Sequence, residues 1–152
     1  MSNRHTKHRP TKEKFFNVVC SSGNGWSELG AWAGVRVDGD NEYAYITCHI
    51  PHDFDKLEEI RLVLLSLATL TPMNLRIVTD YCQAEEAYFE HNELENFNIN
   101  TVLNRMQELN IEAVVDIAPI EPGDYLGIQV SRQAGQNTNC IIIGARIKYL
   151  YQ

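Results

Sequence analysis

The side chains best suited to chemistry in this sequence are histidines and carboxylates that gather in two stretches. They are His49, His52, Asp53 and Asp55 in the first stretch and Glu85, Glu86, Glu90 and His91 in the second. Imidazole and carboxylate groups are common metal ligands, so one interpretation is a cupin-like metalloprotein. Pro51 separates the first two histidines, however, and their rings need not share a face. The other interpretation is polar loops at one end of a sandwich, and the sequence assigns no metal ligand and no cofactor.

No arrangement that would activate a nucleophile is visible. Ser131 and Cys140 lack the flanking residues of a nucleophile elbow, which places a serine on a sharp turn between a strand and a helix. The glycines at 23 and 25 precede no strand-to-helix unit, so they predict a turn rather than a phosphate-binding loop. We therefore expect a protein that is not an enzyme and has no catalytic residue.

Aromatic side chains supply a second kind of candidate. Trp26 and Trp32 lie in the loop-like stretch 25–34, and Tyr88 lies further along the chain. Large rigid rings stack on sugars or anchor subunit contacts, because they bury much area at a small entropic cost. The alternative is that both tryptophans cap the end of the core. An alternative function is therefore a carbohydrate-binding β-sandwich module that uses these three rings.

Charge divides the chain into a basic start and an acidic body. The first 14 residues hold one glutamate and five basic side chains, namely Arg4, Lys7, Arg9, Lys12 and Lys14, although the whole chain has a net charge of −7. We expect residues 1–14 to form a flexible arm that crosses to an acidic neighbour or touches nucleic acid, or else a solvated terminus. We expect residues 15–152 to form one β-sandwich domain. No apolar run is long enough for a membrane span, and the start of the chain lacks the apolar middle region of a signal peptide.

Alternation of apolar and polar residues is the main structural pattern. It predicts strands at 42–50, 74–81, 125–132 and 140–150, with further strands at 15–20 and 33–37. Clusters of turn residues separate these stretches, which is typical of an all-β sandwich or barrel. Residues 55–67 and 99–115 fit either a helix or a strand. The four cysteines form no CxxC pair, so we expect free thiols in a reducing compartment, or a disulfide if the protein is extracellular.

Several short motifs follow one another in a familiar order. They are Pro51, Asp53 and Phe54 at the end of one strand, Glu86, Tyr88 and His91 after the next hairpin, Gly123 and Asp124 before the penultimate strand, and Arg132 at its end. Over about residues 42–150 this order resembles a family of small jelly-roll β-sandwich modules of phage and metagenomic sequences, generally without an assigned activity. Glu85 departs from the pattern, because the family usually has a glycine there.

The resemblance implies that 55–67 and 99–115 are mostly strand, and it adds Glu86 and His91 to Tyr88 as candidate ligand or interface residues. The fold predicted is a single jelly-roll-like antiparallel β-sandwich with a basic arm. The leading hypothesis for function is a self-associating structural component of a phage or virus particle, such as a capsid, decoration or tail element. Its expected partners are copies of itself, other particle proteins and, through the arm only, nucleic acid. Its expected location is the virion or the host cytoplasm, with no membrane contact.

Overall fold

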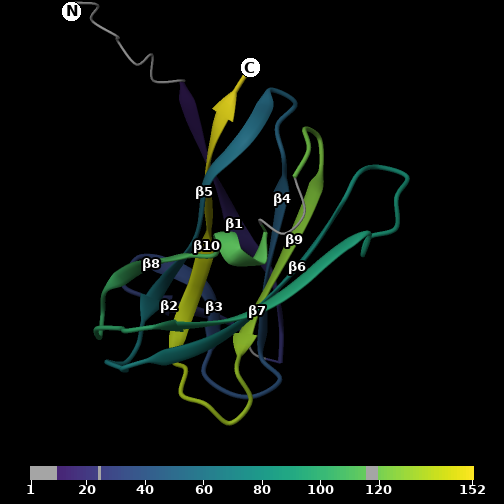
Figure 1. Cartoon of the computed structure of the whole chain (residues 1–152). Coiled ribbons are helices and arrows are strands. Elements are labelled where there is room, and N and C mark those ends of the chain that lie inside the picture. The colour runs from purple at the N-terminus through teal and green to yellow at the C-terminus, as the bar shows by residue number, and fades with distance from the viewer. Residues whose placement is uncertain (1–9, 24, 116–119) are drawn as a thin grey trace, which may run out of the picture.

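The computed structural model describes residues 10–23, 25–115 and 120–152, and it is built almost entirely from strands (Figure 1). The strands are β1 (Thr11–Ser22), β2 (Trp26–Leu29), β3 (Trp32–Val37), β4 (Tyr43–His49), β5 (Phe54–Ser66), β6 (Met73–Cys82), β7 (His91–Ile99), β8 (Met106–Asn110), β9 (Tyr125–Arg132) and β10 (Cys140–Tyr151). Within the described ranges the only helical element is the short 3-10 helix η1 (Glu112–Val114). The predicted all-β class is confirmed.

The strands form two antiparallel sheets, which we call sheet A and sheet B. In sheet A, β10 lies at the centre, with β5 and then β8 on one side. Its other side pairs with β3, followed by β2, and with the first half of β1. Sheet B has the order β1-β4-β9-β6-β7. Strand β1 belongs to both sheets, because it changes partner from β10 to β4 at an irregularity between Val18 and Cys20.

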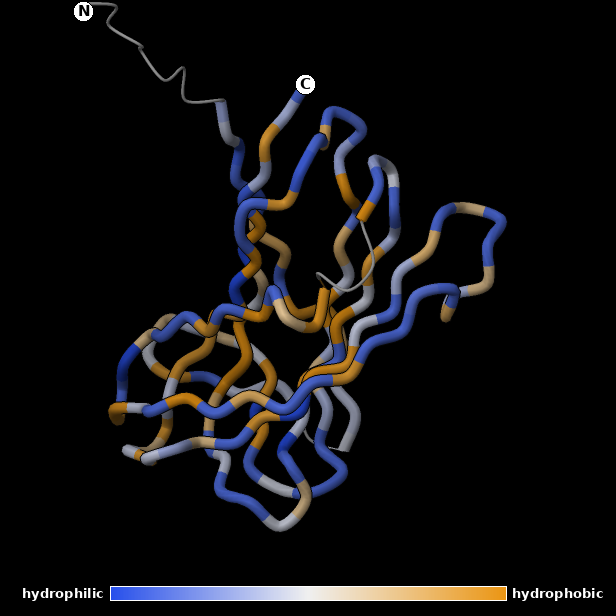
Figure 2. The backbone as a smooth tube through the Cα atoms, in the orientation of Figure 1, coloured by the Kyte–Doolittle hydropathy of each residue, from blue (hydrophilic) through white to orange (hydrophobic). Residues whose placement is uncertain are grey.

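The core lies between the two sheets. Successive side chains of a strand point to opposite faces, so every second residue enters the core. In β6 the buried positions alternate without interruption from Met73 to Tyr81. Full burial of one such large apolar side chain stabilises the fold by about 1.5–3 kcal/mol. Figure 2 shows the hydrophobic stretches along the strands and mostly hydrophilic residues at the hairpin ends.

The two stretches that fit either a helix or a strand, 55–67 and 99–115, have different structures. Residues 54–66 form the long strand β5, in which residues 62–66 are all buried. Its outward residues Val63 and Leu65 are covered by Ile141, Ile143 and Leu29, so both faces of β5 are apolar and the alternation disappears. Residues 99–115 contain the end of β7, the five-residue strand β8 and η1, and are therefore only partly strand.

The start of the chain differs from the predicted arm. Arg4, Lys7 and Arg9 lie outside the described residues, whereas Lys12 and Lys14 belong to β1, which begins at Thr11. Backbone pairing with β10 extends to Thr11 and Leu150 and draws this segment into sheet A. Lys12 is also fixed by its charge, since its Nζ lies 2.5 Å from Asp53 Oδ2 and 4.3 Å from the centre of the Tyr151 ring.

The stretch 25–34 is a hairpin rather than a loop. Strands β2 and β3 pair from Trp26 and Val35 to Leu29 and Trp32, with a two-residue turn between them. Gly30 has a φ of +61° at the first turn position, which suits a tight hairpin connection. The predicted strand at 33–37 lies within β3, but the sequence pattern missed β2, because β2 is only four residues long and its exposed Trp26 obscures the alternation.

The structure contains the four cysteines as free thiols. Cys48 and Cys140 are buried in the core, and this burial raises the pKa of each thiol to about 12. Cys20 is exposed and Cys82 is half-buried. The part of the chain that the structure describes contains no helix of the length and hydropathy needed to cross a membrane.

Candidate ligand-binding groove on sheet B

The outer face of sheet B carries a regular array of side chains from its three inner strands. The outward residues are Tyr43, Tyr45, Thr47 and His49 on β4, Tyr125, Gly127, Gln129 and Ser131 on β9, and Arg76, Val78, Asp80 and Cys82 on β6. The strand register places them in rows that cross the sheet: Tyr43–Ser131–Arg76, Tyr45–Gln129–Val78, Thr47–Gly127–Asp80 and His49–Tyr125–Cys82. Strand β9 therefore lies between β4, whose outward residues are mostly aromatic, and β6, whose outward residues include the charged Arg76 and Asp80.

Small residues on β9 make this array concave. Gly127 has no side chain and Ser131 has a short one, whereas the strands on both sides carry larger residues. Adjacent strands lie about 4.8 Å apart, so the β4 and β6 rows are separated by about 10 Å. We call this depression the β9 groove. It is defined by Gly127, Gln129 and Ser131 as floor, by Tyr43, Tyr45 and Thr47 as one wall, and by Arg76, Val78 and Asp80 as the other.

The groove contains two hollows, one on each side of Gln129. The hollow over Gly127 has a volume of about 180 Å³ and is lined by Tyr45, Thr47, Asp80 and Gln129, among others. The hollow over Ser131 has a volume of about 330 Å³, and its lining includes Tyr43, Arg76 and Arg132. A ligand that fills both hollows would run along the direction of β9.

Hydrogen bonds fix the polar groups of the Gly127 hollow. Asn92 Nδ2 donates to Asp80 Oδ1 at 2.6 Å, and Gln129 Nε2 donates to the Tyr45 hydroxyl at 3.2 Å. An ionised carboxylate has two oxygens that accept, and an amide and a phenol each keep further capacity. Asp80 Oδ2, Gln129 Oε1 and the Tyr45 hydroxyl proton thus supply two acceptors and one donor to a ligand.

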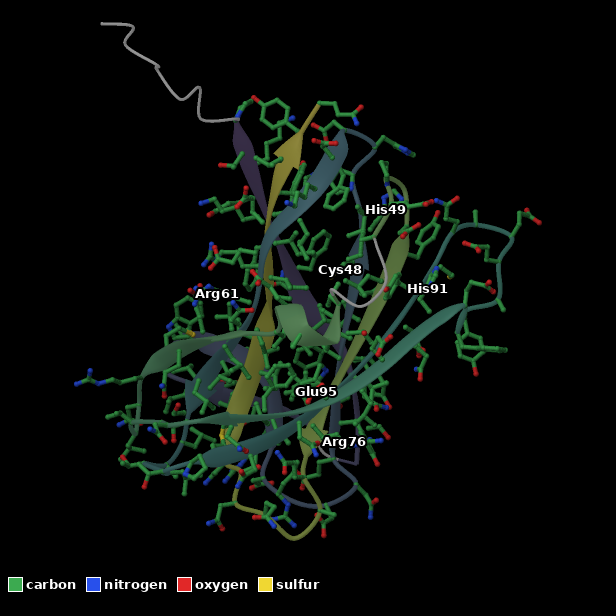
Figure 3. All side chains as sticks on the ribbon, in the orientation of Figure 1. Cys48, His49, Arg61, Arg76, His91 and Glu95 are labelled. Atoms are coloured by element: carbon green, nitrogen blue, oxygen red, sulfur yellow. The ribbon has the colours of Figure 1, made fainter. Side chains whose placement is uncertain are left out.

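The Ser131 hollow is cationic. Arg132 is neutralised there, since its guanidinium lies 2.8 Å from Asp40 Oδ1, and this hydrogen bond holds the pKa of the Asp40 carboxyl below its usual value. The Arg76 guanidinium has no ion pair or hydrogen bond with any residue that the structure describes. Figure 3 shows Arg76 and His49 toward opposite ends of sheet B.

An aromatic cluster lies at the far end of the array. The His49 and Tyr125 rings are 4.9 Å apart and tilted by 33°, and the His52 ring meets His49 edge-on at 5.9 Å. Tyr125 is 49% exposed, so one face of this cluster is open to solvent. Aromatic surface is therefore present both beside the hollows and at the end of the groove.

The two tryptophans predicted from the sequence do not form one site. Trp32 and Leu29 are cross-strand partners on the outer face of sheet A, where Trp32 lines an apolar hollow with Phe15 and Met106. Trp26 pairs with the buried residue Val35 and therefore lies on the opposite side of the hairpin. Neither ring lies on the outer face of sheet B.

The other candidates lie at or near the β6–β7 hairpin. Glu86 accepts a hydrogen bond from the Gln83 backbone at 2.7 Å, and Tyr88 is 72% exposed with its ring against Phe89. His91 stacks on the buried Tyr81 ring at 4.8 Å and faces away from the β9 groove. Glu85 adopts a φ of +75°, so the turn keeps the left-handed conformation for which a glycine is usual.

The metal-binding alternative gains no support from the geometry. In the described ranges no three histidine, cysteine or carboxylate side chains are grouped in a way that could hold a metal ion. His49 and His52 lie at the end of the groove, whereas His91 packs on Tyr81. Asp53 is already bound by Lys12 and by the Tyr149 hydroxyl, which donates at 3.2 Å.

The sequence reasoning missed the residues that form the groove. The alternation within 42–50 and 74–81 does mark Tyr43, Tyr45, Arg76 and Asp80 as outward-facing residues. The absence of a side chain at Gly127, inside a clean strand pattern, was a further signal for close approach or a hollow. Nothing local indicates, however, that β4 and β6 both pair with β9, because these strands are far apart in the sequence.

Comparisons with known proteins give fold-level similarity only. No family model and no curated protein sequence matches the chain. Among solved structures, it is similar to a family 11 carbohydrate-binding module from Clostridium thermocellum in complex with a β-1,3-1,4-mixed-linked tetrasaccharide. That similarity has a TM-score of 0.51 and 6% identity, and it covers 95% of this chain and 91% of the module. It supports the β-sandwich fold.

Two further structures show weaker similarity. One is the CBM36-1 domain of a xylanase from the hindgut metagenome of Trinervitermes trinervoides, with a TM-score of 0.48 and 12% identity over 90% of this chain and 96% of that domain. The other is a Cellvibrio japonicus xylanase in complex with xylopentaose. Its TM-score is 0.48 and its identity 13%, over 90% of this chain and 26% of the xylanase.

The similarity to the family 11 module contradicts the prediction of a self-associating particle component. The structure that the chain matches with a TM-score above 0.5 is a carbohydrate-binding module and not a capsid, decoration or tail protein. The prediction came from a resemblance to phage and metagenomic modules without assigned activity, and one fold serves unrelated functions. The virion role is therefore withdrawn, and with it the expected partners: copies of this chain, particle proteins and nucleic acid.

Proposed function

We propose that this protein is a carbohydrate-binding module, not an enzyme, and that it binds an oligosaccharide along the β9 groove. The observation that carries the proposal is the order of side chains across sheet B, from β4 over β9 to β6. Aromatic residues of β4 and polar residues of β6 stand on either side of a floor in which Gly127 and Ser131 leave space.

A sugar ring fits this order of groups. One face of a pyranose ring is largely apolar, and its edge carries hydroxyl groups that donate and accept. The Tyr43 and Tyr45 rings, which are 6.4 Å apart, offer aromatic surface to the ring face. Asp80 and Gln129 offer hydrogen-bond acceptors to the hydroxyls of the edge. A binding site with a few converging polar groups beside aromatic surface is typical of small-ligand recognition.

The hollows on sheet A are less suited to a sugar. They are lined mainly by apolar side chains such as Trp32, Met106 and Val63. The charged groups beside them are already engaged, because Arg146 Nε donates to Glu108 Oε1 at 3.0 Å. Sugar hydroxyls buried there would lose hydrogen bonds to water without replacement, which costs about 1–3 kcal/mol for each group. The similarity in fold to a module that holds a tetrasaccharide supports a binding function as well.

Isothermal titration calorimetry of the full chain against a panel of neutral and acidic oligosaccharides tests the proposal. A Gly127→Val variant should fold, because a Cβ at this position meets only the Asp80 carbonyl oxygen, at 3.8 Å. Its side chain would fill the hollow over Gly127, so we expect binding to be lost. Gly25→Val is the matched control, since Gly25 lies outside the groove and a Cβ there meets nothing within 4 Å. No binding across the panel, or equal binding by the Gly127→Val variant, would contradict the proposal.

A further inference from the structure

Arg76 differs from the other half-buried arginines that the structure describes in its lack of an ion-pair partner. Each of these others has a carboxylate within ion-pair distance: Arg36 has Asp38, Arg61 has Glu59, Arg132 has Asp40, and Arg146 has Glu13 and Glu108. Arg76 has no such partner in the described ranges, although the whole chain has a net charge of −7. Carboxylates are therefore plentiful, and this guanidinium is left without one.

The position of Arg76 shows where an anion would bind. Its side chain lines the hollow over Ser131, and the one carboxylate that lines the same hollow, that of Asp40, is paired with Arg132. The hollow therefore keeps one unneutralised positive charge. A guanidinium presents its donors in a planar fork, which matches the two oxygens of a carboxylate.

We propose, on the basis of the proposed function, that the glycan bound in the β9 groove carries a carboxylate at the Ser131 hollow, as a uronic acid residue does. Tyr43 lies opposite Arg76 across Ser131, so one sugar residue can place its ring against Tyr43 and its carboxylate against Arg76. Both contacts then come from the same ring, which makes the hollow specific for an acidic sugar rather than for a free anion.

The hollow over Gly127 limits how many charged residues the bound glycan can carry. Asp80 lines the hollow over Gly127, four residues and about 13 Å along β9 from Ser131. A carboxylate accepts hydrogen bonds from sugar hydroxyls but repels a second carboxylate. The preferred ligand is therefore a glycan that combines acidic and neutral residues, and not a polyuronate in which every residue is charged.

Calorimetry with paired ligands tests this inference. Each acidic oligosaccharide, for example glucuronic-acid-substituted xylo-oligosaccharide or a hyaluronan tetrasaccharide, is compared with its carboxyl-reduced form, which keeps the backbone and removes the charge. An oligogalacturonide and a sulfated neutral oligosaccharide complete the panel. We expect at least one mixed acidic ligand to bind about 10- to 100-fold more tightly than its reduced form, and its affinity to fall as salt is raised.

Variants of Arg76 provide the second arm. Arg76→Gln should lose this 10- to 100-fold preference and bind the reduced ligand as the wild type does, while Arg76→Lys should keep part of it. Arg105→Gln makes the same charge change at an exposed position in the turn before β8 and should bind like the wild type. Melting curves of all three variants verify that they are folded.

The outcomes separate this inference from the proposed function. If the protein binds neutral or reduced glycans as tightly as acidic ones, the uronic acid assignment is wrong, while the glycan-binding function stands. Tighter binding of the sulfated ligand or of the oligogalacturonide also overturns the assignment. If no oligosaccharide binds, both the proposed function and this inference fail.

Discussion

Tyr43 on β4 and Arg76 on β6 face each other across Ser131, because each is a register partner of that residue on β9. The short serine side chain lies between an aromatic ring and a guanidinium that has no ion pair with any described residue. In the sequence these three residues are widely separated, and only the order of the strands in sheet B brings them into one row. The predictions about binding rest on this row and its neighbours.

The Tyr43 ring should contribute to affinity through its face. Removal of the ring in Tyr43→Ala is expected to weaken oligosaccharide binding about 3- to 10-fold, which corresponds to the usual contribution of an aromatic contact. Tyr43→Phe keeps the ring and should bind almost as tightly as the wild type. Calorimetry with a ligand that binds the wild type measures both variants. Equal losses in the two variants would show that the hydroxyl, and not the ring face, makes the contact.

Tryptophan fluorescence should not respond to ligand binding. The chain has only two tryptophans, and both lie on the β2–β3 hairpin of sheet A, away from the β9 groove. Titration to saturation, with saturation established by calorimetry, is expected to leave the emission spectrum unchanged. Saturable quenching that disappears in Trp32→Phe would instead place the ligand in the apolar hollow of sheet A.

Arg146 should stabilise sheet A by joining β10 to three other strands. From β10 it bonds Glu13 on β1 and Glu108 on β8 at 3.0 Å each, and it lies 3.7 Å from Glu59 on β5. The side chain is 24% exposed, so Arg146→Met should lower the free energy of unfolding by only about 1–2 kcal/mol. Urea denaturation measures this difference, and Arg105→Met, at an exposed position, should change stability by less than about 0.5 kcal/mol.

The same ion pair predicts a pH dependence. The hydrogen bond from Arg146 lowers the pKa of the Glu108 carboxyl from its usual 4.5. A lowered pKa means that the unfolded chain binds the proton more readily, so the stabilisation is present above pH 4.5 and is lost as the pH falls through the folded-state value. The difference between wild type and Arg146→Met should therefore shrink in acid. A difference that stays constant from pH 7 to pH 3 would contradict this account.

Thiol labelling should distinguish the cysteines. At pH 8 iodoacetamide is expected to modify the exposed Cys20 in the folded protein but not Cys48 or Cys140, because burial raises the pKa of both thiols to about 12 and blocks access. Mass spectrometry with and without urea detects the modified sites. Rapid labelling of the two core thiols in the folded protein would show that the sandwich opens readily.

Raised thiol pKa values also predict lower stability at high pH. The unfolded chain loses these protons near pH 9, whereas the folded chain holds them to about pH 12. The free energy of unfolding should therefore decrease as the pH rises through this interval. Urea midpoints at pH 8, 10 and 11 test this expectation in the wild type, and Cys48→Ala should show a smaller decrease.

Local pattern was sufficient for much of the fold. A side-chain period of two, with β-branched and aromatic residues, identified 125–132 at the bounds that β9 has in the structure, and it located β4, β6 and β10 to within a few residues. A glycine inside a strand pattern indicates a bulge or a close backbone approach. Gly144 lies inside the predicted strand 140–150, at a register shift where a Cβ would meet the Phe16 carbonyl oxygen at 2.2 Å. Both signals are local, because strand alternation and steric limits act over neighbouring residues.

Tertiary structure alone decided the rest. Both faces of β5 are apolar because other segments cover the outer face of sheet A there. Trp26 and Trp32 point to opposite faces because of the register of the short β2–β3 hairpin. The β9 groove depends on β4 and β6 both pairing with β9, which no local pattern encodes because strand pairing is a long-range interaction. The sequence by itself determined the strands and their outward residues, and the order of the strands determined which of those residues share a binding surface.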